Sequence, residues 1–248
     1  MIDFKAVAAE YVQRRERERE RADPNYWVTH RLGEHAWSKQ RETLDSVRDH
    51  KRTLVASCHG SGKTHIASRV VGWWLDTHPK DPNETRVITT APSWNQVANI
   101  MWAYIAGVQA KTGMGGSITA KATWTFPGFK TPTAFGRKPA DYDESTFQGI
   151  HSTYVLAIID EAGGVDENIF TSVETITTNK HARILAIANP DDPNSYMAKI
   201  WREQEKLPPE ERDWNLITIS AFDTPNFTGE EVPERARDNL LQTSWVED

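Results

Sequence analysis

The chain has 248 residues, of which 38% are hydrophobic and 26% charged, so it can bury a core as one large α/β domain or two small ones and is not disordered by composition. Its net charge of −6 excludes a surface that is basic throughout, so any contact with nucleic acid must come from a local patch. With one cysteine, Cys58, and no long apolar run or signal-peptide pattern, we expect a soluble intracellular protein without membrane contact.

The first part of the chain is strongly charged. Residues 14–21 read RRERERER, which places opposite charges at helical pairing distance and predicts a helix. Two interpretations stay open: a solvated helix, or an arm that contacts a neighbouring subunit. Residues 23–25 (DPN) then end this helix. We therefore assign residues 1–35 to a charged helical arm or lid.

From residue 37 onward, predicted strands and helices alternate. Strands are predicted at 53–57, 85–90, 154–159, 183–188 and 214–221. One helix is predicted to begin at Lys63, and a second follows the strand that ends at residue 90. Two more are predicted at 166–177 and 195–207. Two further segments, 117–126 and 131–136, are predicted to be extra strands of a hairpin type. This alternation predicts an α/β fold with an open, mainly parallel sheet and helices on both faces.

A glycine-rich turn follows the first predicted strand. Residues 57–64 read SCHGSGKT and open a predicted helix, where backbone N–H groups and the helix dipole favour phosphate. Lys63 is expected to reach the β- and γ-phosphates, and the Thr64 hydroxyl is expected to hold Mg²⁺. Ser57 departs from the usual pattern, which has glycine there. The predicted phosphate-binding residues are Ser57, Cys58, His59, Gly60, Ser61, Gly62, Lys63 and Thr64.

An acidic pair follows a later apolar run. Residues 154–164 read YVLAIIDEAGG, which predicts a strand buried on both faces with Asp160 at its carboxyl end, beside the phosphate loop. A carboxylate at this position can hold Mg²⁺ through water, so Thr64 and Asp160 are the predicted metal ligands. Glu161 is positioned to polarise the attacking water as a general base, although taken alone it could simply cap the next helix.

These motifs resemble the branch of P-loop ATPases that includes helicases, RecA-like motors and terminases. A superfamily-2 helicase fragment is one alternative, since Gln40 and the TAPS sequence at 90–93 occupy comparable places. Only about sixty residues follow Asn189, however, and a second RecA-like domain would need roughly a hundred. A third possibility is a nucleotide-gated binding module without significant hydrolysis. Glu161 argues against it, because a switch needs no general base.

The whole set of motifs most resembles the ATPase domain of a bacteriophage terminase large subunit, over roughly residues 26–227. The matching segments are WSKQ (37–40), SCHGSGKT (57–64), TAPSWNQ (90–96), IIDEAGG (158–164), AIANP (186–190) and ISAFDTPNF (219–227). The resemblance implies that residues 36–227 form a P-loop ATPase domain that uses ATP and Mg²⁺. It also implies that 228–248 begin a linker to a C-terminal nuclease domain that is missing here.

The resemblance has consequences for function and partners. It implies a motor that drives double-stranded DNA into the procapsid, working with a portal protein and a small terminase subunit. It further implies a homo-oligomeric ring, in the family a pentamer, in the host cell cytoplasm and transiently at the procapsid portal. In isolation the chain could also be a monomer.

Three residue roles come from the resemblance. Gln40 is the candidate adenine ligand, or otherwise an exposed helix residue. Asn189 either orients the water or couples γ-phosphate loss to motion, or otherwise is a turn residue before proline. Many terminases have an arginine in the phosphate loop where this chain has His59. Because an arginine that stabilises the transferring phosphate raises the rate of hydrolysis about 10³–10⁵-fold, we expect another residue to take its place. The candidate is Arg137 acting on a neighbour's ATP, with Lys138 second; Arg137 could also be an ordinary surface residue.

Overall fold

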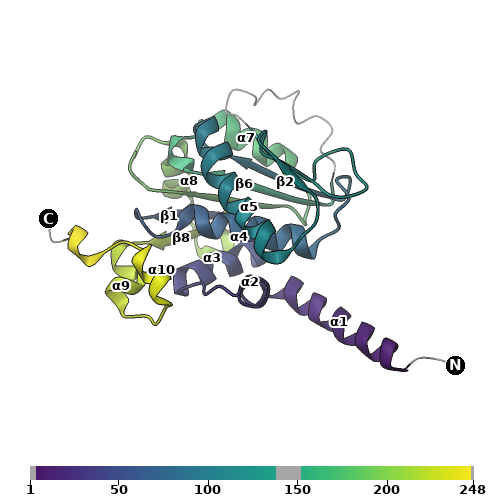
Figure 1. Ribbon diagram of the computed structural model, residues 1–248. Coiled ribbons are helices and arrows are strands. Elements are labelled where there is room, and N and C mark those ends of the chain that lie inside the picture. The colour runs from purple at the N-terminus through teal and green to yellow at the C-terminus, as the bar shows by residue number, and fades with distance from the viewer. Residues whose placement is uncertain (1–3, 138–151, 247–248) are drawn as a thin grey trace.

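A computed structural model describes residues 4–137 and 152–246 (Figure 1). Its strands are β1 Arg52–Ser57, β2 Thr85–Thr90, β3 Ser117–Thr119, β4 Thr123–Thr125, β5 Ala134–Gly136, β6 Tyr154–Asp160, β7 Arg183–Ala188 and β8 Asn215–Ile219. Its α-helices are α1 Phe4–Ala22, α2 Pro24–Leu32, α3 Ser38–Asp49, α4 Lys63–Thr77, α5 Trp102–Thr112, α7 Glu167–Ile176, α8 Tyr196–Gln204, α9 Pro225–Thr228 and α10 Glu234–Asp238. A π-helical turn η1 (Gln96–Met101) and 3-10 turns η3 (Ala162–Gly164), η4 (Pro209–Glu211), η5 (Ala221–Asp223) and η6 (Thr243–Val246) complete the elements.

The eight described strands form one sheet in the order β3-β4-β5-β2-β6-β7-β1-β8. From β5 to β8 all neighbours are parallel, and the two antiparallel pairings, β3 with β4 and β4 with β5, lie at one edge. The predicted fold class is confirmed. One feature was not predicted: β7 lies between β1 and β6, so the phosphate-loop strand and the Asp160 strand are not adjacent.

Helices cover both faces of the sheet (Figure 1). On one face α4 and α5 pack with α2 and α3 around a large apolar cluster that contains Trp27, Leu44 and Val70. On the other face α7 and α8 bury Phe170 and Ile200 against β1, β6 and β7. The central strands are therefore apolar on both faces, which explains their continuous hydrophobic runs.

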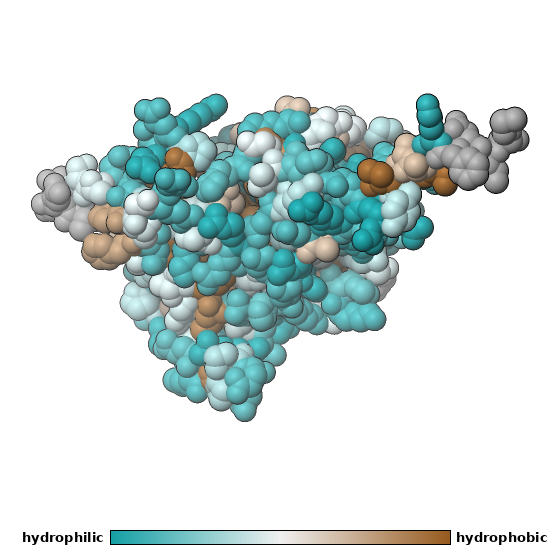
Figure 2. Space-filling model, turned by 90° about the horizontal axis from the view of Figure 1, so that it is seen from below, coloured by the Kyte–Doolittle hydropathy of each residue, from teal (hydrophilic) through white to brown (hydrophobic). Residues whose placement is uncertain are grey.

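The predicted charged helix is α1, and its outer turns project from the body of the domain (Figure 1). Tyr11 and Val12 on this helix are 63% and 64% exposed. Seen from below, the molecule is mostly hydrophilic, with apolar colour in small patches that include one on the projecting helix (Figure 2). No helix among the described residues is long and apolar enough to cross a membrane.

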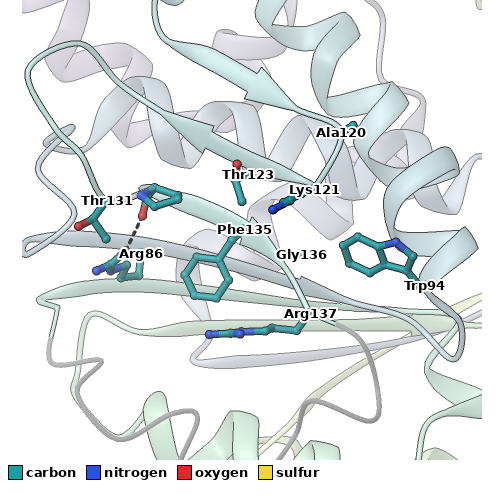
Figure 3. A pocket seen from close by; sticks show the side chains of 10 residues that line it. Arg86, Trp94, Ala120, Lys121, Thr123, Thr131, Phe135, Gly136 and Arg137 are labelled. Atoms are coloured by element: carbon teal, nitrogen blue, oxygen red, sulfur yellow. Dashed lines mark hydrogen bonds between the residues drawn. The ribbon is translucent and has the colours of Figure 1, made fainter.

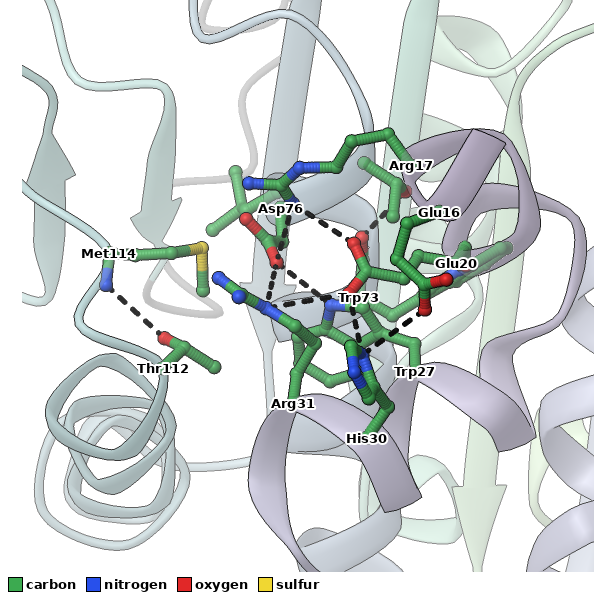
Figure 4. Close-up of polar contacts among 12 residues, drawn as sticks. Glu16, Arg17, Glu20, Trp27, His30, Arg31, Trp73, Asp76, Thr112 and Met114 are labelled. Carbon is green, nitrogen blue, oxygen red and sulfur yellow. Dashed lines mark hydrogen bonds and ion pairs between the residues drawn. The ribbon is translucent and has the colours of Figure 1, made fainter. Parts of the chain in front are cut away.

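A polar junction ties α1 and α2 to α4 (Figure 4). The Asp76 carboxylate accepts hydrogen bonds from Trp27 Nε1 (2.9 Å), Arg31 Nε (3.1 Å) and Arg17 Nη1 (3.3 Å). Burial alone would raise the pKa of Asp76, but the indole hydrogen bond and the cations lower it, so the carboxylate stays charged. Glu20 is 2% exposed and pairs with Arg17 at 3.1 Å. The base of the arm is thus fixed to the domain.

Several boundaries differ from the prediction. Helix α8 ends at Gln204 rather than 207, because the Gln204 side chain turns back to accept the backbone N–H groups of Asp213 and Trp214. Helices α2 and α3 were not predicted as separate elements, and neither were α9 and α10. The division into 1–35, 36–227 and 228–248 stays a prediction. Contacts cross those boundaries. Trp27 packs in the core of the domain, and Leu241 donates a backbone hydrogen bond to Gly60 of the phosphate loop.

Candidate functional site

The phosphate loop connects β1 to α4 at the carboxyl edge of the sheet. Gly60 and Gly62 adopt left-handed backbone angles, with φ of +66° and +83°, which other residues rarely adopt. These angles turn the loop so that helix α4 starts immediately after it, at Lys63. Ser57 and Ser61 share a hydroxyl–hydroxyl contact of 2.6 Å across the base of the loop. Ser57, at the position where glycine is usual, therefore braces the loop from within.

Lys63 is buried and points into the loop rather than into solvent. Its ammonium group donates to the Cys58 carbonyl at 3.2 Å and to Asn189 Oδ1. Lys63 is 8% exposed and Asn189 is 7% exposed, so this contact is shielded from water. Both acceptors are neutral, so the charge of Lys63 is available for an anionic ligand.

Asp160 faces the first turn of α4. The Thr64 hydroxyl donates to Asp160 Oδ2 at 2.9 Å, which brings the two predicted metal ligands together despite the intervening strand β7. The other carboxylate oxygen, Oδ1, is buried and has no hydrogen-bond partner among the described residues. Burial, together with the charge of Glu161, raises the pKa of Asp160 to about 6.

This arrangement fits a divalent cation. A hydroxyl and a carboxylate with one free buried oxygen are hard oxygen donors, which Mg²⁺ prefers. Such an ion would also compensate the unfavourable burial of Asp160, because a positive charge beside a carboxylate favours its charged form. Thr64 and Asp160 are thus the residues that would hold the metal.

Glu161 has an unusual backbone conformation. Its φ of 48° and ψ of 45° lie in the left-handed region, which costs free energy for a residue with a side chain. This turn reverses the chain at the end of β6 and begins the 3-10 turn η3. Strained conformations of this kind are concentrated at functional sites. Glu161 therefore starts the turn instead of capping α7, whose N-cap position is held by Asp166.

Gln40 lies next to the phosphate loop. Its side-chain amide is buried and donates to the Ser61 carbonyl at 3.4 Å. A Cβ atom on Gly62 would lie 2.8 Å from Gln40 Nε2, so the glycine also makes room for this amide. Gln40 is 5% exposed, which excludes the alternative of an exposed helix residue.

The remaining loop residues differ in environment. Burial raises the pKa of the Cys58 thiol, and the backbone of Cys58 is fixed by a 2.8 Å bond from its N–H to the Ile219 carbonyl. His59 is exposed, and its Nε2 lies 3.6 Å from an Asp191 carboxylate oxygen on the loop after β7. His59 therefore occupies the rim of the phosphate loop and contacts the Asn189 loop.

Arg137 lies away from this cluster. It follows β5, and four strand spacings, or about 19 Å, separate β5 from β1. This distance is longer than an arginine side chain, so Arg137 does not meet the phosphate loop of its own chain. Its backbone N–H bonds to the Thr89 carbonyl at 2.9 Å, which places it at the same carboxyl edge of the sheet. Lys138 lies outside the described residues.

The sequence prediction missed a contact from the end of the chain. The backbone N–H of Leu241 donates to the Gly60 carbonyl at 3.0 Å, and Leu241 is buried. Nearby, the Glu230 carboxylate accepts from the Ser38 N–H at 2.9 Å and from Arg41 at 3.1 Å. Only the apolar pair LL at 240–241 within a polar tail signalled this packing in the sequence.

The fold and the site together define a P-loop nucleotide-binding domain. A glycine-rich loop opens a helix, its lysine and threonine face inward, and the threonine contacts an aspartate at the end of a buried strand. No known protein-family profile matches the chain. In sequence the chain is similar to a probable terminase large subunit of Enterobacteria phage P7, with 27% identity over 175 residues, which is 64% of this chain and 33% of that protein. The matched region therefore spans about a third of that relative.

Comparison with solved structures shows that phage large terminases share this fold. The large terminase ATPase domain of Thermus phage P74-26 matches with a TM-score of 0.60 and 17% identity, over 88% of this chain and 97% of that one. The large terminase of another thermophilic bacteriophage, solved in complex with ADP, matches with a TM-score of 0.57 and 16% identity, over 81% and 48%. That of bacteriophage HK97 matches with a TM-score of 0.55 and 16% identity, over 75% and 40%. The predicted resemblance to the ATPase domain of phage large terminases is confirmed.

Proposed function

We propose that this chain hydrolyses ATP and is the motor domain of a phage terminase large subunit that moves double-stranded DNA into a procapsid. The observation that carries the proposal is the Thr64–Asp160 contact, with Asp160 Oδ1 left free beside the strained Glu161. A site that only bound nucleotide would not need an acidic residue held in this conformation. The resemblance to large terminases, one of them solved in complex with ADP, supports nucleotide binding by the same fold.

Each residue then has a role. The loop amides and Lys63 bind the phosphates, and Gln40 contacts the adenine from the side of the loop. Thr64 and Asp160 hold Mg²⁺, which when bound supplies charge stabilisation to the phosphate oxygens. Glu161 takes a proton from the attacking water. Asn189, which accepts from Lys63 in this structure, responds to the γ-phosphate.

The arginine is supplied by a neighbouring copy in a homo-oligomeric ring. Arg137 lies at the carboxyl edge of the sheet but too far from its own phosphate loop, so a role in hydrolysis requires the ATP of an adjacent subunit. Its loss is expected to lower turnover by about 10³-fold or more. The portal protein and the small terminase subunit are the partners implied for the assembled motor in the host cytoplasm.

The test is ATP turnover per subunit over a wide range of protein concentrations. Lys63→Ala serves as the blank, and Glu161→Gln is expected to bind ATP without turning it over. Turnover that rises with concentration supports a site completed between subunits. Constant turnover would rule out the trans role of Arg137, and normal turnover by Glu161→Gln would refute the general-base assignment. No turnover at any concentration, with ATP still bound, would favour a nucleotide-gated binding module.

A further inference from the structure

A cavity lies on the sheet, far from the phosphate loop. It has a volume of about 620 Å³ and opens between β2, β4 and β5 and the turn before β4 (Figure 3). Three cationic side chains and two aromatic rings line it: Arg86, Lys121, Arg137, Trp94 and Phe135. We refer to these five residues as the basic groove. Among the described residues its lining contains no aspartate or glutamate, although the chain as a whole carries a charge of −6.

The cations of the groove are held in place without being neutralised. The guanidinium groups of Arg86 and Arg137 lie 6.0 Å and 4.9 Å from the centre of the Phe135 ring. Arg86 also donates to the Pro132 carbonyl. No carboxylate among the described residues lies within ion-pair distance of Arg86, Lys121 or Arg137, and Asp81 acts on Arg86 only from farther away. Stacking on an aromatic ring orients a guanidinium but leaves its N–H donors free.

One donor in the groove has no partner in the part of the chain that the structure describes. Arg137 Nε is buried and makes no hydrogen bond to any described residue. A buried donor without an acceptor costs free energy, about 1–3 kcal/mol by general experience, which an anionic oxygen would recover. Figure 3 shows the Arg137 side chain lying along the groove beneath Phe135. Thr123 adds a hydroxyl to the same wall. The described part of the groove therefore offers N–H and O–H donors and has no acid in its lining.

We propose that the basic groove binds the phosphodiester backbone of double-stranded nucleic acid. The inference rests on the proposed function, since a DNA-moving motor with an acidic chain needs a local cationic surface. Phosphate oxygens are the acceptors that unpaired guanidinium and ammonium groups bind best. An acidic surface of a second copy of the chain is a different occupant, and the experiment below separates the two.

The test uses Arg86→Gln/Lys121→Gln, which removes two charges from the groove and leaves Arg137 intact. The control is Arg202→Gln/Lys206→Gln on and after α8. Arg202 likewise donates to a proline carbonyl and Lys206 is likewise exposed. Binding of a labelled duplex of about 30 base pairs is followed by fluorescence anisotropy over a series of salt concentrations. If each lost phosphate contact accounts for about 0.9 of the salt slope, the slope falls by about 2 and affinity near 0.1 M salt drops more than about tenfold.

The outcomes separate the groove from the motor. ATP turnover without DNA is expected to be normal in the groove variant, while the control binds DNA like the wild type. If the groove variant bound DNA more weakly but the wild-type chain had no ATPase activity, the DNA-binding role of the groove would be supported and the motor function refuted. Wild-type DNA binding by a well-folded groove variant would overturn the groove, as would a change confined to self-association. Should the double variant fail to fold, Lys121→Glu at an exposed position must weaken DNA binding on its own, and unchanged binding there overturns the proposal.

Discussion

The contact between Lys63 and Asn189 makes a prediction that can be worked out in detail. In this structure the buried lysine donates to Asn189 Oδ1 and to the Cys58 carbonyl. An incoming phosphate must attract the same ammonium group, so Asn189 competes with the nucleotide for Lys63. Changing Asn189 to aspartate replaces a neutral acceptor by a charged one at nearly the same position. We expect the variant to bind ATP more weakly.

The size of the effect follows from the burial of both groups. The present bond already has a charged donor and contributes about 1.5–3 kcal/mol. A carboxylate in place of the amide makes it a buried ion pair, and breaking such a pair costs about 3–5 kcal/mol. Nucleotide binding must therefore give up about 1–2 kcal/mol more, before any repulsion between the new carboxylate and the phosphates is counted. The dissociation constant of ATP should rise at least about tenfold, because a tenfold change corresponds to about 1.4 kcal/mol.

The assay is isothermal titration calorimetry with Mg·ATP in a Glu161→Gln background, where ATP is expected to persist. Asn189→Ala removes the competing acceptor and should leave affinity unchanged or slightly tighter. Asn194→Asp adds the same charge to the exposed part of the same loop and should have little effect. If the aspartate variant bound ATP within about threefold of the parent, or alanine weakened binding as strongly, the competition for Lys63 would be refuted.

Three further predictions concern stability and the loop. Glu34 accepts two hydrogen bonds of 2.7 Å from the buried Arg69, so Glu34→Gln should lower the free energy of unfolding by about 3 kcal/mol in urea. Glu18→Gln in an exposed pair should cost less than about 0.5 kcal/mol, and equal losses would contradict the argument. Burial lowers the pKa of His78 from 6.5 to about 4, so between these values the unfolded chain binds the extra proton and stability falls as pH drops. His78→Phe should flatten that slope by up to about 1.4 kcal/mol per pH unit, and an unchanged slope would contradict the assignment. Gly62→Ala should weaken ATP binding about tenfold or more, because its Cβ would lie 2.8 Å from Gln40 Nε2 at a φ of +83°. Gly229→Ala, at a φ of +75° with open space around it, should leave binding intact, and equal effects would show that the contact with Gln40 is irrelevant.

The parts of the site that were predictable depend on local patterns. SCHGSGKT lies between an apolar strand and an amphipathic helix, and that context alone predicts a phosphate loop. Asp160 follows a continuous apolar run, so its position at the carboxyl edge was also predictable. Both inferences use the rule that parallel strands end at the same edge of a sheet, which holds whatever the order of the strands.

What could not be predicted depends on long-range packing. Strand order is not encoded in any one segment, so nothing in RILAIA indicated that β7 would lie between β1 and β6. Helix α2 is only nine residues long and is stabilised by burying Trp27 and Val28 in the core. The contact of Leu241 with Gly60 joins residues 181 positions apart by a single backbone bond, which no periodicity can signal. The role of Arg137 depends on a second subunit and so stays a prediction.

The position of β7 gives Asn189 its significance. The strand carries Asn189 to the edge of the sheet between Lys63 and Asp160, so one side chain lies between the phosphate-binding and the acidic parts of the site. Its backbone carbonyl would lie 3.1 Å from a Cβ on Gly163, so the turn that begins at Glu161 packs directly on it. Asp191, two residues later, contacts His59 across the loop at 3.6 Å. A shift of Lys63 toward a phosphate would thus change the contacts of Asn189 with the Glu161 turn and of its loop with the rim of the phosphate loop. We therefore expect Gly163→Ala, which lies outside the phosphate loop, to lower ATP turnover more than ATP affinity. Equal losses of both would indicate that the substitution disturbs the whole site and would refute a selective effect on the Glu161 turn.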